Sequence, residues 1–561
     1  MAPRLILGPI LRYTDSQDAT IWVETDESCE VAVEVAGSSH TSDTFHVEGH
    51  HYALVRVSNL EPGKSYEYEV TLAGEKVWPE MGSGFPPSVV RTLDTGAPFK
   101  LAFGSCRAAG PPETSLSGKR DESDTDALDA LSTRMRDESL EYWPDALLLL
   151  GDQIYADEVS PGTREYIRSR RNTDEPPGKE VANFEEYTRL YWDSWGEPSI
   201  RWLLSTVPSA MIFDDHDVND DWNTSEAWVD RMRGKPWWDE RIAGGFMSYW
   251  IYQHLGNLSP HELADKEILN RVKEADDAGP LLRNFAHTAD RDVKSVRWSF
   301  RRDFGNSRLI VVDSRAGRIL KEGERRMVDA KEWEWVQSQA TGDFEHLLIG
   351  TSLPLIMAPA LHHLESWNEA VCAGAWGKAA ARVGEAIRQG IDLEQWPAFR
   401  NSFNEFVELL RSVSAGERGA APNSITVLSG DVHHTYLAEI DLPAPNSGSS
   451  VYQATCSPLR KSMPEVLRLL FRATWTERGT LVPRFLARAA RVDSTKANWR
   501  LVHDEPWFEN HVAILTLNGP ESALEIEKAV WKDEESSKTA TLRKIFTHHL
   551  ARNPEKTRGK G

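Results

Sequence analysis

Hydrophobic and polar positions alternate over short runs through residues 1–96, and polar turns separate the runs. Alternation with a period of two is typical of strands that bury one face and expose the other. Residues 1–96 are therefore predicted to form a small all-β sandwich domain ahead of the rest of the chain. The runs with this pattern are ATIWVE, EVAVEVAG, HYALVRVSNL, SYEYEVTLAG and SVVRTL.

The segment LEPGKSYEY, residues 60–68, resembles the turn that precedes the tyrosine-corner strand of fibronectin III domains. We therefore expect the N-terminal domain to be a β-sandwich of the fibronectin III or immunoglobulin-like kind. Sandwiches of this kind serve many unrelated roles, so the resemblance indicates a fold and no activity.

From Phe99 onward the pattern changes to short runs that are apolar at every position. Such runs are typical of strands buried on both faces, as in a sheet covered by helices. Each run leads directly into polar residues, and in open α/β sheets ligands bind where the strands end. We expect the chemistry of the chain at one edge, at the ends of six strands: KLAFGSC, DALLLLGD, SAMIFDDHD, RLIVVDSR, HLLIGTS and SITVLSGD.

Long insertions separate these strands and are expected to wall the mouth of the site. Their many Trp residues are predicted to pack helices on the sheet rather than to stack on substrate, since Trp mostly contributes buried area. We place a catalytic domain at residues 97–530, and a C-terminal helix with a disordered basic tail at 531–561. The insertions span residues 158–207, 221–300, 359–418 and 460–505.

The composition and the charge of the chain argue against several classes of binding partner and of location. A formal net charge of −22 disfavours nucleic acid, because phosphate backbones are held by clusters of Lys and Arg. No run approaches the roughly 18 apolar residues that a membrane span requires, and the first residues lack the pattern of a secretion signal. The four Cys residues lie far apart, which predicts neither a disulfide framework nor a paired-cysteine zinc site. We expect a cytoplasmic protein without a transmembrane segment.

The first candidate for chemistry is Asp152, in the segment GDQIYAD after a buried strand. Gly151 lets the backbone turn tightly there, and a carboxylate just beyond a strand is well placed to bridge two cations. The alternative is that Asp152 caps a following helix.

Five carboxylates crowd the segment DDHDVNDD, residues 214–221, after the strand SAMIF. They repel one another strongly unless cations neutralise them, so this crowding favours a metal site. A solvated acidic loop is the alternative.

Asp431 and His433 lie two residues apart in SGDVHHTY, after the strand SITVL. On an extended segment both side chains point to the same side, which suits two ligands of a shared metal pair. His434 then points elsewhere and is predicted either to support the ligands from outside or to be structural, rather than to bind the metal.

Two further strand ends offer a thiolate and guanidinium groups. Cys106 in FGSCR is a soft donor, although a buried inert Cys is the commoner case. Arg315 and Arg318 in VDSRAGR can grip phosphate oxygens, and Arg315 could equally pair with Asp313.

Together these segments resemble the alkaline phosphatase D, or PhoD-like, family of calcineurin-like metallophosphoesterases. The resemblance rests on FGSCR, GDQIYADE, FDDHDVNDDW, VDSRAGR and SGDVHHTY, which follow one another in the family's order across residues 99–440. It implies an α/β fold with a metallophosphatase-type β-sandwich flanked by helices. It also implies a phosphate-ester substrate, hydrolysed by water that two metals activate.

The resemblance further implies a ligand set for each metal. Fe³⁺ would be held by Cys106, Asp152, Tyr155 and His433, and Asp152 would also bridge to the second metal. Anionic thiolate and phenolate donors suit ferric iron.

The second metal would be held by Asp215 and Asp431. It is Ca²⁺ in the family, which is consistent with oxygen-only ligands, and another divalent metal is the alternative at this site. His216 would lie near the substrate, to protonate the leaving group or to steady the transition state. In the two-metal mechanism that the resemblance implies, Arg315 would neutralise the charge that develops on the phosphoryl group.

The sequence departs from the family pattern in three places. Asp217 stands where the family usually has Glu, Arg107 stands where Gln is frequent, and the secretion signal of secreted members is missing. The third departure leaves location and substrate open, and monoesters and diesters are both possible substrates. The rival functions are a mononuclear iron oxygenase, for which no facial triad is evident, and a calcium-binding scaffold or adhesion protein built on the sandwich.

Overall fold

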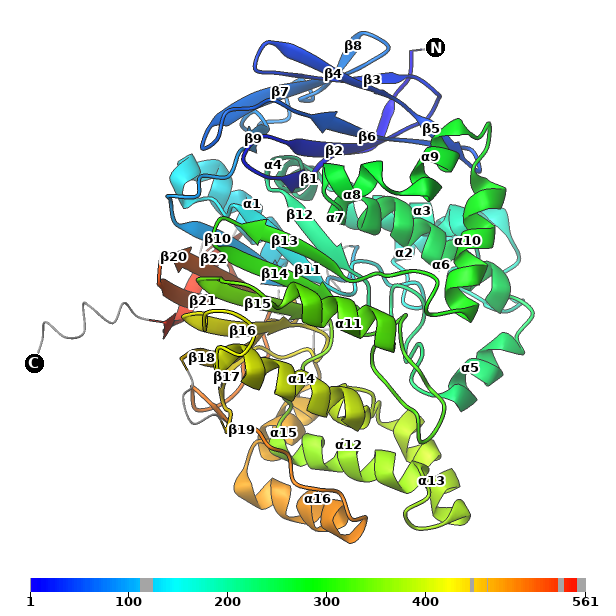
Figure 1. Cartoon of the computed structure of the whole chain (residues 1–561). Helices are drawn as coiled ribbons and strands as arrows, with labels where there is room; N and C mark the ends of the chain where they lie inside the picture. Colours follow the sequence, from blue (N-terminus) through cyan, green and yellow to red (C-terminus); the bar gives the residue numbers. More distant parts are fainter. Residues whose placement is uncertain (1, 111–124, 444–447, 462, 533–538, 552–561) are drawn as a thin grey trace, which may run out of the picture.

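The computed structural model describes residues 2–110, 125–443, 448–461, 463–532 and 539–551. The N-terminal strands are β1 (Leu5–Thr14), β2 (Ala19–Thr25), β3 (Glu30–Val35), β4 (Ser38–Asp43), β5 (Phe45–Val47), β6 (His50–Val57), β7 (Ser65–Leu72), β8 (Glu75–Trp78) and β9 (Val89–Arg91). One sheet has the order β1-β2-β6-β5, the other has the order β4-β3-β7-β8, and β9 pairs with β7. Their apolar side chains form a core of their own. The predicted all-β domain is confirmed (Figure 1).

The predicted turn at residues 60–68 leads into β7. There the backbone N–H of Glu61 donates to the hydroxyl of Tyr66 at 3.1 Å. The contact ties the strand back to the chain just upstream of it, as in a tyrosine corner. The narrower fibronectin III assignment stays a prediction.

Two larger sheets form the framework of the second part of the chain. The first has the order β12-β11-β10-β20-β21-β22 and the second β13-β14-β15-β16-β18-β17-β19. The strands of the first are β10 (Phe99–Gly104), β11 (Ala146–Leu150), β12 (Ser209–Ile212), β20 (His511–Asn518), β21 (Glu521–Trp531) and β22 (Ala540–Ala551). Those of the second are β13 (Phe300–Phe304), β14 (Ser307–Val312), β15 (His346–Thr351), β16 (Ser424–Ser429), β17 (Tyr436–Asp441), β18 (Ser450–Thr455) and β19 (Asn498–Leu501).

The two larger sheets pack face to face. Gly350 of β15 approaches β11 so closely that an added Cβ would lie 3.3 Å from a methyl of Leu150. Along β14 the side chains alternate: Leu309 joins the core shared with β11, while Ile310 joins the core on the opposite face of the sheet. Because both faces are covered, the strands are apolar at every position.

Helices cover the outer faces of this sandwich. α1 lies against β20–β22, and α11 and α14 lie over the seven-stranded sheet (Figure 1). The fold is thus the predicted α/β metallophosphatase-type β-sandwich flanked by helices. The helices are α1 (Ala127–Asp137), η2 (Leu140–Tyr142), α2 (Pro161–Arg170), α3 (Phe184–Trp195), α4 (Pro198–Thr206), α5 (Glu226–Arg233), α6 (Trp238–Ser248), η3 (Tyr249–His254), α7 (Leu255–Asn257), α8 (Pro260–Ala264), α9 (Glu267–Glu274), α10 (Gly279–Arg291), α11 (Ala330–Gln339), α12 (Pro359–Cys372), α13 (Lys378–Gly390), η4 (Trp396–Ala398), α14 (Arg400–Ser414), α15 (Glu465–Thr474) and α16 (Glu477–Ala489).

Several Trp residues of the insertions are completely buried, which confirms their predicted packing role. They fill the space between helices and sheets rather than line a site. Those with almost no exposed surface are Trp195, Trp202, Trp222, Trp238, Trp298 and Trp396.

The prediction of a C-terminal helix within residues 531–561 is wrong. Residues 540–551 form β22, which pairs antiparallel with β21, with Phe546 opposite Ile526. The open edge of β21 offers a row of backbone N–H and C=O groups, and a neighbouring strand satisfies them whereas a helix could not. The predicted disordered tail at residues 552–561 lies outside the described residues.

All four cysteines are free thiols, as the sequence indicated. Among the described residues, the helices are all too short or too polar to cross a membrane.

Candidate metal centre

The six predicted strand ends divide between the two larger sheets, three in each. β10, β11 and β12 are parallel neighbours in one sheet, and β14, β15 and β16 are parallel neighbours in the other. Their carboxyl ends meet at one end of the sandwich, since Cys106 after β10 lies 3.4 Å from the carbonyl oxygen of Asp431 after β16. The chemistry is therefore assembled between two sheet edges rather than along one.

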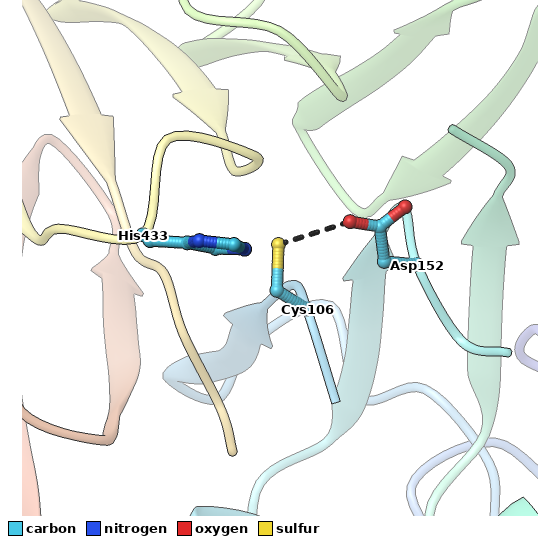
Figure 2. Close-up of side chains that lie close together, drawn as sticks. All are labelled: Cys106, Asp152 and His433. Atoms are coloured by element: carbon cyan, nitrogen blue, oxygen red, sulfur yellow. Dashed lines mark hydrogen bonds between the residues drawn. The ribbon is translucent and has the colours of Figure 1, made fainter. Parts of the chain in front are cut away.

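A thiol, a carboxylate and an imidazole converge at this end (Figure 2). The donor atoms of Cys106, Asp152 and His433 all lie within 4.8 Å of one another. The Cys106 Sγ is 3.3 Å from Oδ2 of Asp152, and both side chains are fully buried. The three residues form a compact set of donors of the kind that can hold one transition-metal ion.

Tyr155 lies beside this set. Its ring packs against the imidazole of His216 at 4.6 Å between centroids, and its buried hydroxyl has no hydrogen-bond partner among the described residues. Burial, together with the nearby Cys106 and Asp152, raises the pKa of Tyr155 well above its usual range. The hydroxyl is thus a buried polar group without a protein partner in the described part of the chain.

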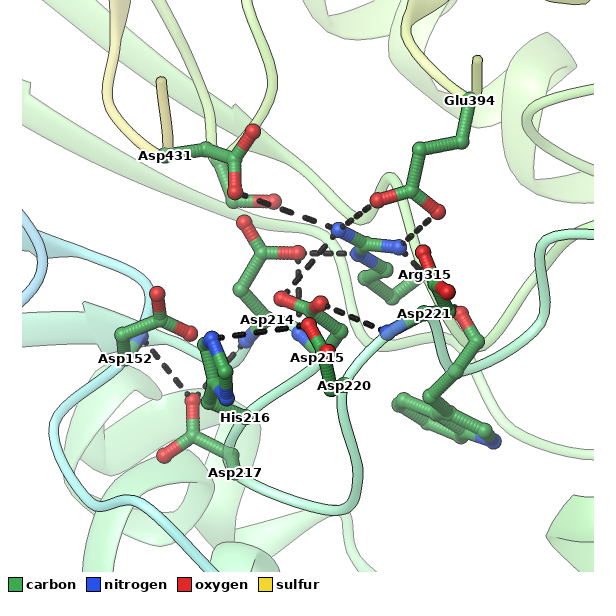
Figure 3. Close-up of polar contacts among 12 residues, drawn as sticks. Asp152, Asp214, Asp215, His216, Asp217, Asp220, Asp221, Arg315, Glu394 and Asp431 are labelled. Atoms are coloured by element: carbon green, nitrogen blue, oxygen red, sulfur yellow. Dashed lines mark hydrogen bonds and ion pairs between the residues drawn. The ribbon is translucent and has the colours of Figure 1, made fainter. Parts of the chain in front are cut away.

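A second set consists of carboxylates alone. Donor oxygens of Asp152, Asp214 and Asp215 lie within 4.8 Å of one another. Arg315 connects this set to Asp431, because its Nη2 lies 3.2 Å from Oδ1 of Asp215 and 4.0 Å from Oδ1 of Asp431 (Figure 3). Asp152 belongs to both sets, as a residue that bridges two cations must.

Buried donor atoms without a hydrogen-bond partner indicate that these residues are suited to hold cations. Among the described residues, Oδ1 of Asp152 is buried without a hydrogen-bond partner, as is the hydroxyl of Tyr155. A buried polar atom left unpaired costs about 1–3 kcal/mol. Burial also raises the pKa of Asp152, Cys106 and Asp431 well above their usual ranges. A cation would offset both penalties by pairing with the charged forms.

The two histidines of SGDVHHTY have different environments. Burial, and then the neighbouring Lys461, lowers the pKa of His433 to about 3, so its imidazole is neutral and can donate a lone pair. The ring of His434 is buried, and its Nδ1 lies 2.6 Å from the carbonyl oxygen of Val432. His434 is therefore structural, which is one of its two predicted roles.

His216 is held by a carboxylate that the sequence interpretation missed. Its Nδ1 lies 2.9 Å from Oδ1 of Asp157, and its Nε2 lies 3.7 Å from Asp220. Burial would lower the pKa of His216, but Asp157 and Asp215 raise it well above its usual range. Asp157 belongs to the GDQIYADE motif, so the signal was its place on the same loop as Asp152.

Arg315 is enclosed by carboxylates. It is fully buried and pairs with Asp214 and with Glu394, the latter at 2.5 Å. Asp313, the alternative partner, instead accepts the backbone N–H of Arg315. Although burial opposes it, Arg315 and His216 lower the pKa of Asp215 to about 2, which keeps that carboxylate charged. Glu394 comes from an insertion, and no motif in the sequence marks it.

A pocket opens beside both donor sets. Three of the four insertions contribute to its described lining: residues 359–418, residues 460–505 and, through Asp221, residues 221–300. The insertion at 158–207 supplies none of its described lining. The residues that matter for its chemistry and its mouth are Asp215, His216, Asp431, His433, Leu467 and Phe471.

Two alternative interpretations of the sequence do not hold. Asp152 caps no described helix, because the next helix, α2, is capped by Ser160. A solvated acidic loop does not describe Asp214, Asp215 and Asp217, whose exposed fractions are 0%, 5% and 2%.

Comparisons with known proteins agree with this geometry. The sequence matches the PhoD-like phosphatase family over residues 130–474, and a domain of unknown function, DUF7800, over residues 2–90. No curated protein matches the sequence. A solved structure of PhoD aligns with 97% of this chain and 90% of its own, at 12% identity and a TM-score of 0.59, which indicates a shared fold.

A type III pullulan hydrolase from Thermococcus kodakarensis aligns over 98% of this chain and 100% of its own, at 9% identity and a TM-score of only 0.14, and carries no argument. The family match, in contrast, spans more than half of the sequence and includes Asp152, Tyr155, Asp215 and Asp431. The chain belongs to the PhoD-like phosphatase family and is accordingly a metal-dependent phosphoric ester hydrolase.

Proposed function

We propose that this protein hydrolyses phosphate esters with two cations, Fe³⁺ and Ca²⁺, held at the strand ends. The observation that carries the proposal is the shared carboxylate of Asp152, which belongs to both donor sets. The set that contains Cys106 and His433, with Tyr155 beside it, suits ferric iron. The set of carboxylates, with Asp431, offers only oxygen and suits calcium.

When bound, the two cations would polarise the phosphoryl oxygens and lower the pKa of the attacking water. The oxygen of that water forms a bond to phosphorus, and the bond from phosphorus to the leaving oxygen breaks. A monoester then gives an alcohol and phosphate, and a diester gives an alcohol and a phosphomonoester.

His216 supplies the proton to the leaving oxygen in this proposal. Its imidazole lines the pocket and its pKa is raised by the nearby carboxylates, which favours the charged form. Asp157 fixes the orientation of the ring through Nδ1, so Nε2, 3.7 Å from Asp220, is the nitrogen that faces the substrate in this proposal. A positioned acid of this kind typically contributes about 10²–10⁴-fold to the rate.

Arg315 acts as a positioning residue. Because its guanidinium is fully buried among Asp214, Asp215 and Glu394, its donors are directed at carboxylates rather than at a substrate phosphate. It holds Asp215 charged and in place for the second cation. This role replaces the direct phosphate contact that the sequence suggested.

Turnover of p-nitrophenyl phosphate and of its bis-ester tests the proposal, and elemental analysis of the purified protein identifies the metals. We expect hydrolysis of at least one ester, loss of it after prolonged chelation, and partial recovery on adding calcium while iron remains bound. Full activity of metal-free protein would contradict the mechanism, and hydrolysis with zinc or manganese in both sites would contradict the choice of metals.

A further inference from the structure

The outward face of α15 is apolar. Val466, Leu469 and Leu470 follow one another at helical spacing and are 77%, 62% and 59% exposed. A helix on the surface of a globular protein normally turns its apolar side chains inward and its polar ones to solvent. α15 reverses this arrangement, and a partner that covers the stripe would remove the penalty of its exposure.

The next helix, α16, does the same. Leu481, Val482 and Phe485 are 61%, 66% and 69% exposed, and they again follow helical spacing. α15 and α16 contact each other, with only two residues between them. We call these six side chains the α15–α16 surface.

The α15–α16 surface lies in a basic segment of an acidic protein. Residues 460–500 contain ten Lys and Arg against three Asp and Glu, although the whole chain carries a net charge of −22. Arg478 and Arg488 flank the apolar stripe of α16, and no carboxylate of the described residues lies within ion-pair distance of either. The surface therefore combines apolar side chains with positive charge that no described carboxylate neutralises.

The first helix of this surface, α15, borders the candidate metal centre. Leu467, itself 42% exposed and next to the stripe, and Phe471, farther round α15, line the pocket together with His433 and Asp431. Whatever covers the α15–α16 surface therefore lies next to the mouth of the pocket.

We propose that the α15–α16 surface docks on an anionic phospholipid bilayer. A helix with Leu, Val and Phe on one face and Arg beside them is typical of proteins that lie in the membrane interface, where the apolar side chains enter the acyl boundary and the Arg residues bind headgroups. Nucleic acid would match the charge but would leave the apolar stripes exposed. A symmetric second copy would bring Arg478 and Arg488 against their own equivalents.

Sedimentation with vesicles tests this proposal without any need for turnover. The full-length protein should bind vesicles of phosphatidylcholine mixed with phosphatidylglycerol, and bind those of phosphatidylcholine alone more weakly. Val482→Glu with Phe485→Glu should weaken binding about a hundredfold or more. Arg478→Gln with Arg488→Gln should weaken it about thirtyfold, and only on the anionic vesicles. Met81→Glu is the matched control, since Met81 is a fully exposed apolar residue of the N-terminal domain.

Three results would overturn the proposal. They are the absence of binding to the anionic vesicles, binding that both double variants retain, and a dimer in gel filtration that the α16 substitutions dissociate while no vesicle binds. Hydrolysis of the soluble p-nitrophenyl esters by the same variants should remain at the parental level, because none of the substituted side chains lines the pocket. That readout separates a failure of docking from a failure of the proposed hydrolysis.

Discussion

Four of the residues at the candidate metal centre adopt left-handed backbone conformations. The φ angles of Cys106, Asp152, Asp431 and His433 are 56°, 51°, 66° and 50°. Each such non-glycine residue costs of order 1–3 kcal/mol, and strain of this kind persists where the surrounding fold imposes it. The tight turns after β10, β11 and β16 therefore direct these side chains toward one another at an energetic cost.

Asp152→Asn tests the bridging role without disturbing this backbone, because Asn tolerates the left-handed region better than most residues. We expect activity to fall by several orders of magnitude, since both cations would lose a shared negative charge, while His216→Ala should cost about 10²–10⁴-fold. Glu48→Gln is the control, because Glu48 has a similar φ of 48° and lies in the N-terminal domain, outside the pocket. The opposite order of severity for Asp152→Asn and His216→Ala would contradict the assigned roles.

The visible absorption that Tyr155 would cause as an iron ligand distinguishes an iron-containing site from a pair of colourless metals. If its buried hydroxyl binds Fe³⁺ as a phenolate, the concentrated protein should absorb visible light, and Tyr155→Phe should bleach this band while the fold stays intact. Absorption spectra with parallel iron determination measure this. A colourless protein that contains one equivalent of ferric iron would show that Tyr155 is not a ligand.

At the scale of elements, Arg315 joins three segments that are distant in sequence. It follows β14 and pairs with Asp214 after β12 and with Glu394 before η4. Arg315→Met should lower the free energy of unfolding by about 3–5 kcal/mol, because it leaves buried carboxylates without a counter-charge. Urea unfolding measures this change, and calcium affinity should fall with it.

A matched control is Arg326→Met. Arg326 forms a partly exposed ion pair with Glu405 and should lose less than about 1 kcal/mol. If Arg315→Met raised only KM and left stability unchanged, Arg315 would contact the substrate after all.

The strand ends are predictable from the sequence because an apolar run that stops at a charged residue is typical of a buried strand that ends at a polar site. Asp152 and Asp215 are found in this way, and the structure places their carboxylates together. Glu394 is not predictable, because it reaches Arg315 from a helical insertion whose path depends on tertiary packing. The strand at residues 540–551 is mistaken for a helix because half of its side chains are polar, and only its pairing with β21 decides the conformation.

At the scale of the whole molecule, His50 connects the N-terminal sandwich to the catalytic part. Its Nδ1 lies 2.8 Å from Glu24 of β2, and its Nε2 lies 3.1 Å from Glu185 of α3. Burial would lower the pKa of His50, but the carboxylates of Glu185 and Glu24 raise it to about 9. The hydrogen bond from His50 lowers the pKa of Glu185 to about 2.

These two pKa shifts determine how the free energy of unfolding changes with pH. The charged form of His50 contributes to the free energy of unfolding. This contribution is fully present below the unfolded pKa of about 6.5 and is lost as the pH rises through about 9. We expect a loss on the order of 2 kcal/mol across that range, after allowance for the partial exposure of the site. Glu185 affects the free energy of unfolding at lower pH. Its stabilising contribution is fully present above a pH of about 4.5 and is lost as the pH falls through about 2.

Urea unfolding across this pH range tests the connection. His50→Gln should flatten the pH dependence, and His261→Gln, at a side chain that is 89% exposed, should leave it unchanged. An unchanged slope in His50→Gln would show that other groups govern it.

The position of β10 affects how the protein is made. β10 pairs on one side with β11, which follows it closely in the chain, and on the other side with β20, where Phe99 lies opposite Leu517. A ribosome therefore releases all the residues between β10 and β20 before the partner of that second edge emerges. Until then the nascent chain carries an open strand at the centre of its largest core, which is a template for wrong pairing. Closure of the sandwich must wait until β20 has been synthesised, and chaperones that shield strand edges should influence the yield.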